Sequence, residues 1–161
     1  MAKQEFQFSY ESYKSIDELK KDDASLLEEA RKVTQQAYAP YSHFNVAAVA
    51  KLINGEKVVG TNQENASYPV GLCAERVLLS AISSVFPNTA IDTLAISYHN
   101  LNGDSSKPVS PCGMCRQALL EYEDRTKKPI RIILSGMSGE VVIIEKAAQL
   151  LPLSFGGENL K

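Results

Sequence analysis

The sequence has no tryptophan, only three cysteines and only two histidines among its 161 residues. An odd number of cysteines without a secretory leader argues against a disulfide framework and favours a metal or catalytic use of the thiols. Long hydrophobic runs are also missing, since no stretch approaches the roughly 20 apolar residues that a membrane span needs. We therefore expect a cytoplasmic protein with no membrane partner.

A surplus of basic charge is missing as well. Seventeen Lys and Arg residues stand against nineteen Asp and Glu residues, for a formal net charge of -2. Binding to DNA or RNA relies on positive charge to offset the phosphates, so a nucleic-acid partner is disfavoured. The content of 44% hydrophobic and 22% charged residues is typical of a globular chain. The length suits one core, which we assign to a single domain at residues 22–161 after an N-terminal extension at 1–21.

Strands and helices alternate in the expected order of elements. Residues 22–39 place apolar side chains on one helical stripe that stops before Pro40. Asn54-Gly55 is a strong two-residue hairpin signal between the apolar runs at 46–53 and 56–61. Further helices are expected at 73–86, after Pro111 and at 145–150, and further strands at 91–98, 130–135 and 141–145. This order indicates an α/β fold, a three-layer α/β/α sandwich with a mixed five-stranded sheet.

The three cysteines lie at the starts of two expected helices, where unpaired backbone N–H groups favour the thiolate. Cys112 and Cys115 have the two-residue separation that lets both sulfurs reach one tetrahedral metal, and Cys73 supplies a third ligand. Three protein ligands leave one position for water, as in catalytic zinc sites. A Cys-x-x-Cys pair alone also suits a thiol redox site, and a structural zinc site normally has a fourth ligand.

Glu75 follows Cys73 by two residues, close enough to touch water on the metal without being a ligand. That placement suits a general acid and base. Three thiolates make the site negative, so we expect the guanidinium groups of Arg76 and Arg116 to donate to the ligand sulfurs. The two histidines, His43 and His99, form no ligand pair, and we expect both in solvent-facing loops.

Together, Cys-Ala-Glu-Arg and Pro-Cys-Gly-Met-Cys-Arg-Gln resemble the motifs of the homotetrameric, zinc-dependent cytidine deaminases, over about residues 38–160. The resemblance implies one zinc per chain and hydrolytic deamination of cytidine and deoxycytidine, a reaction of pyrimidine salvage. Glu75 would carry a proton from water to N3 of the base and then to the departing amine. Two alternatives stay open: a deaminase of a cytosine-bearing nucleoside antibiotic, like the blasticidin deaminases, and a non-catalytic structural zinc module.

The resemblance also implies how a pyrimidine nucleoside is bound. Residues 62–68 are similar to the family's ribose-binding segment, and Phe44 resembles the aromatic residue that stacks on the base. In the family, an aromatic at the position of Phe155 reaches into a neighbouring subunit's site, which implies a homotetramer with shared active sites. The segment at 99–107, which looks long for the family, is expected to alter the pocket rim. The implied substrate-binding residues are Phe44, Asn62, Glu64, Asn65, Ala66, Tyr68 and Phe155.

Overall fold

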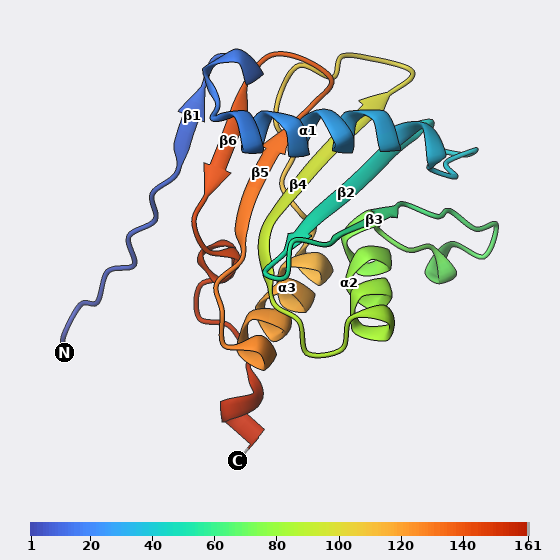
Figure 1. Cartoon of the computed structure of the whole chain (residues 1–161). Helices are drawn as coiled ribbons and strands as arrows, with labels where there is room; N and C mark the ends of the chain where they lie inside the picture. Colours follow the sequence, from blue (N-terminus) through green and yellow to red (C-terminus); the bar gives the residue numbers. More distant parts are fainter. Residues whose placement is uncertain (161) are drawn as a thin grey trace.

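A mixed sheet runs through the middle of the molecule, with helices on both of its faces (Figure 1). The computed structural model describes residues 1–160, and no helix among them is long and apolar enough to cross a membrane. The strand order is β1-β6-β5-β4-β2-β3, and β4 and β5 pair in parallel. The strands are β1 (Glu11–Tyr13), β2 (Phe44–Leu52), β3 (Lys57–Thr61), β4 (Ile91–Asn100), β5 (Arg131–Ser135) and β6 (Val141–Ile144). The expected α/β sandwich is confirmed.

The sheet has six strands, so the expected count of five was one short. The additional strand β1 comes from the N-terminal extension and pairs antiparallel with β6, Glu11 lying opposite Ile143. The hydroxyl of Ser12 also donates to the Glu140 carboxylate at 2.7 Å. Three residues are too few to show a strand period in the sequence, and their pairing partner lies far along the chain. Residues 1–10, which precede this strand, are exposed and extend away from the sheet (Figure 1).

Helix α1 (Lys21–Val33) covers one face of the sheet. Its apolar stripe is buried, as the sequence predicted, and it packs on small and branched side chains of the central strands. This core cluster contains Leu26, Leu27, Ala30, Val33, Ala47, Val49, Ala95, Ile133, Val141 and Ile143. A short 3₁₀ turn, η2 (Thr34–Gln36), continues the helix toward Pro40.

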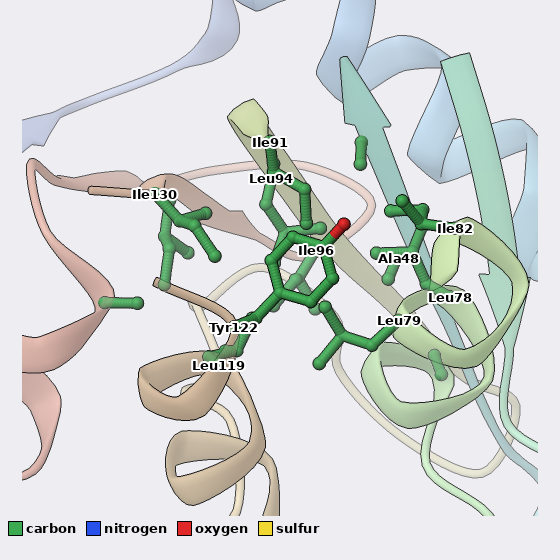
Figure 2. Close-up of a cluster of buried hydrophobic side chains, with 14 of the residues drawn as sticks. Ala48, Leu78, Leu79, Ile82, Ile91, Leu94, Ile96, Leu119, Tyr122 and Ile130 are labelled. Atoms are coloured by element: carbon green, nitrogen blue, oxygen red, sulfur yellow. The ribbon is translucent and has the colours of Figure 1, made fainter. Parts of the chain in front are cut away.

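Helices α2 (Ala74–Val85) and α3 (Gly113–Thr126) cover the opposite face. Figure 2 shows Leu78 and Ile82 of α2 and Leu119 of α3 packed with apolar side chains of β4, Leu94 and Ile96. Both predicted helices are confirmed, and each begins one residue after a cysteine. The two helix starts that carry the cysteine motifs therefore lie on the same side of the sheet.

Two glycines shape the strands beside α2. Gly55 has a φ of 88° in the turn between β2 and β3. The Leu52 N–H donates to the Glu56 carbonyl, so the hairpin loop has three residues, one more than the Asn54-Gly55 signal predicted. Gly60 on β3 lets α2 come close, because a Cβ there would lie 2.5 Å from both the Ala74 carbonyl oxygen and the Leu78 amide nitrogen. The absence of a side chain at Gly60 thus sets how near the first turn of α2 sits to the sheet.

A buried carboxylate ties α3 to the C-terminal part of the chain. Glu123 accepts hydrogen bonds from the backbone N–H groups of Ile130 at 2.6 Å, Ala147 at 2.9 Å and Ala148 at 3.0 Å. The last two begin η4 (Ala147–Leu150), a 3₁₀ turn where the sequence predicted a short helix. One side chain thereby satisfies the N–H groups of Ile130 and Ala148, and it shares the N–H group of Ala147 with the Ile130 carbonyl oxygen, 3.0 Å away.

Candidate metal centre

The three sulfurs meet between the starts of α2 and α3. Cys73 is the N-cap of α2, Cys112 is the N-cap of α3, and Cys115 lies in the first turn of α3. Neither N-cap sulfur is hydrogen-bonded to its own helix backbone, so both remain available as ligands. The Sγ atoms of Cys73 and Cys112 are 3.8 Å apart, and those of Cys112 and Cys115 are 3.5 Å apart.

These separations fit a zinc ion. With Zn–S bonds of about 2.3 Å in a tetrahedron, two sulfur ligands stand about 3.8 Å apart. All three sulfurs lie within 4.8 Å of one another, and they form the one such cluster of potential metal ligands within residues 1–160. Cys115 is buried, whereas Cys73 and Cys112 line a pocket. A zinc ion held here would therefore keep its fourth position open on that side.

Hydrogen bonds among the three thiols change their pKa values. A hydrogen bond from Cys115 is the main cause that lowers the pKa of Cys73 to about 6, against the opposing effect of burial. The same hydrogen bond, together with burial, raises the pKa of Cys115. The cluster thus holds thiolate character at Cys73, and thiolate is the form in which cysteine binds metals.

Glu75 lies in the first turn of α2 and lines the same pocket as Cys73. Its side chain is almost enclosed, with 5% of the residue exposed. Burial raises the pKa of its carboxyl group above the ordinary value. A carboxyl group that shares the pocket of the thiol cluster and is shielded from bulk water can hold and pass on a proton.

The pocket has a volume of about 630 Å³, which is within the usual range for small-molecule sites. It lies over the start of β2 and the C-terminal half of β4, and against the starts of α2 and α3. Ala66 and Phe155 are not among the residues that line it. The lining includes these predicted site residues: Phe44, Asn62, Glu64, Asn65, Tyr68, Cys73, Glu75, Arg76 and Cys112.

Two polar side chains of the pocket hold the chain around β2. Asn62 accepts a hydrogen bond from the Val46 N–H at 2.7 Å and donates one to the Phe44 carbonyl at 2.9 Å. Glu64 accepts hydrogen bonds from the backbone N–H groups of the two residues after Pro40, at 2.9 and 3.2 Å. A side-chain hydrogen bond from Ser42 is the largest of the effects that lower the pKa of Glu64. Both side chains fix the backbone that carries Phe44.

Arg116 bonds to backbone near the cluster. Its guanidinium donates to the carbonyl oxygens of Pro111 at 2.9 Å and Leu150 at 3.0 Å, which braces the segment that leads into α3. The expected donation from Arg116 or Arg76 to a sulfur stays a prediction.

Of the two histidines, His99 lies within β4 and is partly buried, so its expected loop position was wrong.

Phe155 is 59% exposed, so it does not cap the core of its own chain. Its carbonyl oxygen accepts a hydrogen bond from the Gln117 side chain at 2.9 Å, which tethers the tail to α3. The apolar side chain is left on the surface of the single chain. Leu153, two residues earlier, is exposed as well.

Several pocket residues were not assigned to the site from the sequence, among them Tyr98, Val109 and Ser110. Tyr98 ends a buried run of β4, and its ring stacks on Phe44 with 4.8 Å between the centroids. The signal that points to Tyr98 is strand alternation, which puts it on the same face as the core residues of β4. Val109 and Ser110 come from the long segment before α3. Both follow the 99–107 segment, none of whose residues lines the pocket, so the expected effect of that segment on the rim stays a prediction.

Fold and site together define a class of protein: an α/β/α domain that can hold catalytic zinc, since two of its three clustered sulfurs line a pocket that contains a buried carboxyl group. Residues 20–129 match the family model described as cytidine and deoxycytidylate deaminase zinc-binding region. The chain belongs to this family.

Curated relatives and solved structures agree with this assignment. The chain is 34% identical to a cytidine deaminase of Halalkalibacterium halodurans over 86% of its own length and 98% of that protein. A crystal structure of cytidine deaminase from Burkholderia pseudomallei superposes with a TM-score of 0.70 at 34% identity, covering 81% of this chain and 97% of that one. A blasticidin-S deaminase of Bacillus cereus is 29% identical over 85% of this chain and 94% of its own.

Proposed function

We propose that the protein hydrolytically deaminates cytidine and 2′-deoxycytidine to uridine and deoxyuridine, as a step of pyrimidine salvage. The observation that carries the proposal is the meeting, in one pocket, of a three-sulfur cluster at zinc spacing and the buried carboxyl group of Glu75. The similarity to cytidine deaminases over nearly the whole of their length supports the choice of substrate.

The proposed roles follow from where the groups lie. Cys73, Cys112 and Cys115 hold one Zn²⁺ per chain, and zinc, when bound, supplies the Lewis acid that makes water nucleophilic near neutral pH. Glu75 takes a proton from the attacking water and delivers it to N3 of the cytosine ring, and it then moves the proton of the new C4 hydroxyl to the departing amine. The C4–O bond forms, the C4–N bond breaks, and ammonia leaves. Arg76 offsets part of the negative charge of the thiolates.

We assign binding of the nucleoside to Phe44 at the start of β2 and to residues in the segment after β3. Phe44 offers a ring face to the base, and Asn62 and Glu64 offer hydrogen bonds to the sugar. Both polar side chains already bond to backbone, yet a carboxylate and an amide have further sites for a ligand. Asn65 and Tyr68 extend the wall toward solvent, and Ala66 lies between them in sequence.

We further propose a homotetramer in which Phe155 closes a neighbouring subunit's pocket. Its 59% exposure and its place outside the lining of its own pocket support this role. Tyr68, at 89% exposure on the rim, would likewise be covered by a neighbour. We assign the catalytic unit to residues 22–161, and the family match at residues 20–129 lies mostly within it. The need for three reduced thiols suits the cytoplasm.

A second candidate is the deamination of a cytosine-bearing nucleoside antibiotic, favoured by the similarity to a blasticidin-S deaminase. It would use the same cluster and the same Glu75. A structural zinc module is disfavoured, because a structural site closes its fourth position with protein. Here two of the three sulfurs line a pocket instead.

The test is an ultraviolet assay of zinc-loaded protein with cytidine, 2′-deoxycytidine and blasticidin S as separate substrates. We expect loss of cytidine and deoxycytidine absorbance at a higher kcat/KM than that of the antibiotic. Higher kcat/KM for the antibiotic would move the assignment to the second candidate. If the protein bound stoichiometric zinc but turned over none of the three substrates, the result would favour the structural zinc module.

A further inference from the structure

Tyr98 lies near the C-terminal end of β4, in the wall of the pocket. Successive strand residues point to opposite faces, so Tyr98 shares a face with Leu94 and Ile96, which pack under α2 and α3. Its ring stacks on that of Phe44, with 4.8 Å between centroids and 11° between planes. Tyr98 therefore backs the aromatic side chain to which we assign the base.

The hydroxyl group of Tyr98 has no hydrogen-bond partner among the residues that the structure describes. Tyr98 is only 6% exposed, yet no hydrogen bond within residues 1–160 uses its hydroxyl. In that part of the chain, Gln149 Oε1 is the only side-chain N or O atom that is both fully enclosed and unpaired. The Tyr98 hydroxyl is therefore not sealed inside the core but opens on the pocket that the residue lines. Buried phenols normally have a hydrogen-bond partner, and here the space for one is the ligand site.

Tyr98 lies at the same end of the sheet as the residues to which we assign nucleoside binding. Tyr98 pairs in register with Val46, and the N–H group of Val46 donates to Asn62. Asn62, which directly follows β3, and the phenol of Tyr98, on β4, therefore line the pocket at the same end of the sheet. A polar ligand that reaches Asn62 comes to the same end of the sheet as Tyr98.

We infer that Tyr98 is a further substrate-binding residue, whose O–H group hydrogen-bonds to a polar atom of the nucleoside while its ring supports Phe44. The inference rests on the proposed function, since the ligand in question is the nucleoside. It adds a hydrogen-bonding group that the cysteine motifs and the 62–68 segment do not contain.

Tyr98→Phe removes the hydroxyl and keeps the ring stack, so it isolates the hydrogen bond. We expect KM for cytidine to rise about fivefold, and at least threefold, the loss typical of one hydrogen bond between uncharged groups. The value of kcat should stay within about twofold, because the reacting groups are untouched. The dissociation constant of uridine, measured by calorimetry on the zinc-loaded chain, should rise in parallel and gives a readout that does not depend on turnover.

Tyr122→Phe is the matched control. The Tyr122 hydroxyl donates to the Thr89 carbonyl at 2.7 Å, and Figure 2 shows the ring among the core side chains. Removal of this hydroxyl leaves a carbonyl unpaired inside the protein. We expect Tyr122→Phe to lower Tm and to leave KM unchanged, the reverse of the pattern for Tyr98→Phe.

The outcomes are separable. A threefold or larger rise in both KM and the uridine dissociation constant, with wild-type Tm and zinc content, supports the role of Tyr98. A smaller change in either constant overturns it, as does a fall in Tm or zinc content that accompanies the change, since Tyr98 would then act through the fold. The proposed function fails separately, if the wild-type chain with its zinc does not deaminate cytidine, and the inference would fall with it.

Discussion

Gly60 on β3 is the position where α2 comes closest to the sheet, and its replacement by alanine should displace the start of that helix. The added Cβ would lie 2.5 Å from the Ala74 carbonyl oxygen and from the Leu78 amide nitrogen, where ordinary contacts begin at 3.4 Å. The difference between the two distances requires a shift of about 0.9 Å. Both obstructing atoms belong to the backbone, so no change of side-chain rotamer relieves the clash.

Such a shift would change the distance between the metal-site residues carried by α2 and those carried by α3. Cys73 caps α2 and Glu75 lies in its first turn, whereas Cys112 and Cys115 belong to α3. We expect Gly60→Ala to destabilise the chain by about 1–3 kcal/mol, the usual cost of overpacking. A misplacement of about 1 Å at reacting groups costs roughly 10²-fold in activity. Zinc affinity should fall too, since the Cys73–Cys112 separation would leave its present 3.8 Å.

The assay compares zinc content after dialysis against a chelator, kcat/KM for cytidine, and Tm. Gly157→Ala serves as the control, because a Cβ at Gly157 would meet nothing within 4 Å. It should match the wild type in all three measurements. If Gly60→Ala also matched the wild type, the close approach of α2 to β3 would not be what positions the site.

Three further predictions concern other parts of the molecule. Glu123→Ala leaves the N–H groups of Ile130 and Ala148 without their acceptor, whereas Ala147 keeps the Ile130 carbonyl, so urea unfolding should show a loss of about 2 kcal/mol or more, and Glu123→Gln a smaller one; equal stability would contradict this. Gly136→Ala collides with the Ser105 carbonyl and should shift the long segment before α3, which raises KM for cytidine severalfold with zinc retained; an unchanged KM would exclude that segment from substrate binding. Chains with Phe155→Ala and chains with Glu75→Gln should each be impaired, and mixed tetramers should regain activity; no regain despite proven subunit exchange would contradict a shared pocket.

Local sequence signals predicted the parts of the fold that depend on neighbouring residues. Asn54-Gly55 set the β2–β3 turn through the positive φ of Gly55. The apolar periodicity after Cys73 and after Cys112 located α2 and α3 to within a residue or two. Because both motifs begin helices, the sequence also predicted that the thiols lie at helix N-termini.

Features set by contacts between distant segments could not be read in the same way. Strand β1 depends on pairing with β6, far along the chain, and its three residues have no period of their own. The stack of Tyr98 on Phe44 exists only because β2 and β4 are neighbours. The bonds of Arg116 to two backbone carbonyls likewise depend on how the C-terminal segment returns to α3.

The central claim is that Glu75 moves protons for a zinc-dependent deamination in the pocket beside Cys73. Zinc content and cytidine turnover, measured on the same preparations of the wild type and of Glu75→Gln, test it most directly. We expect one zinc per chain in both and a loss on the order of 10²-fold or more of kcat in the Gln variant. A Gln variant that binds one zinc and deaminates cytidine at close to the wild-type rate would contradict the account.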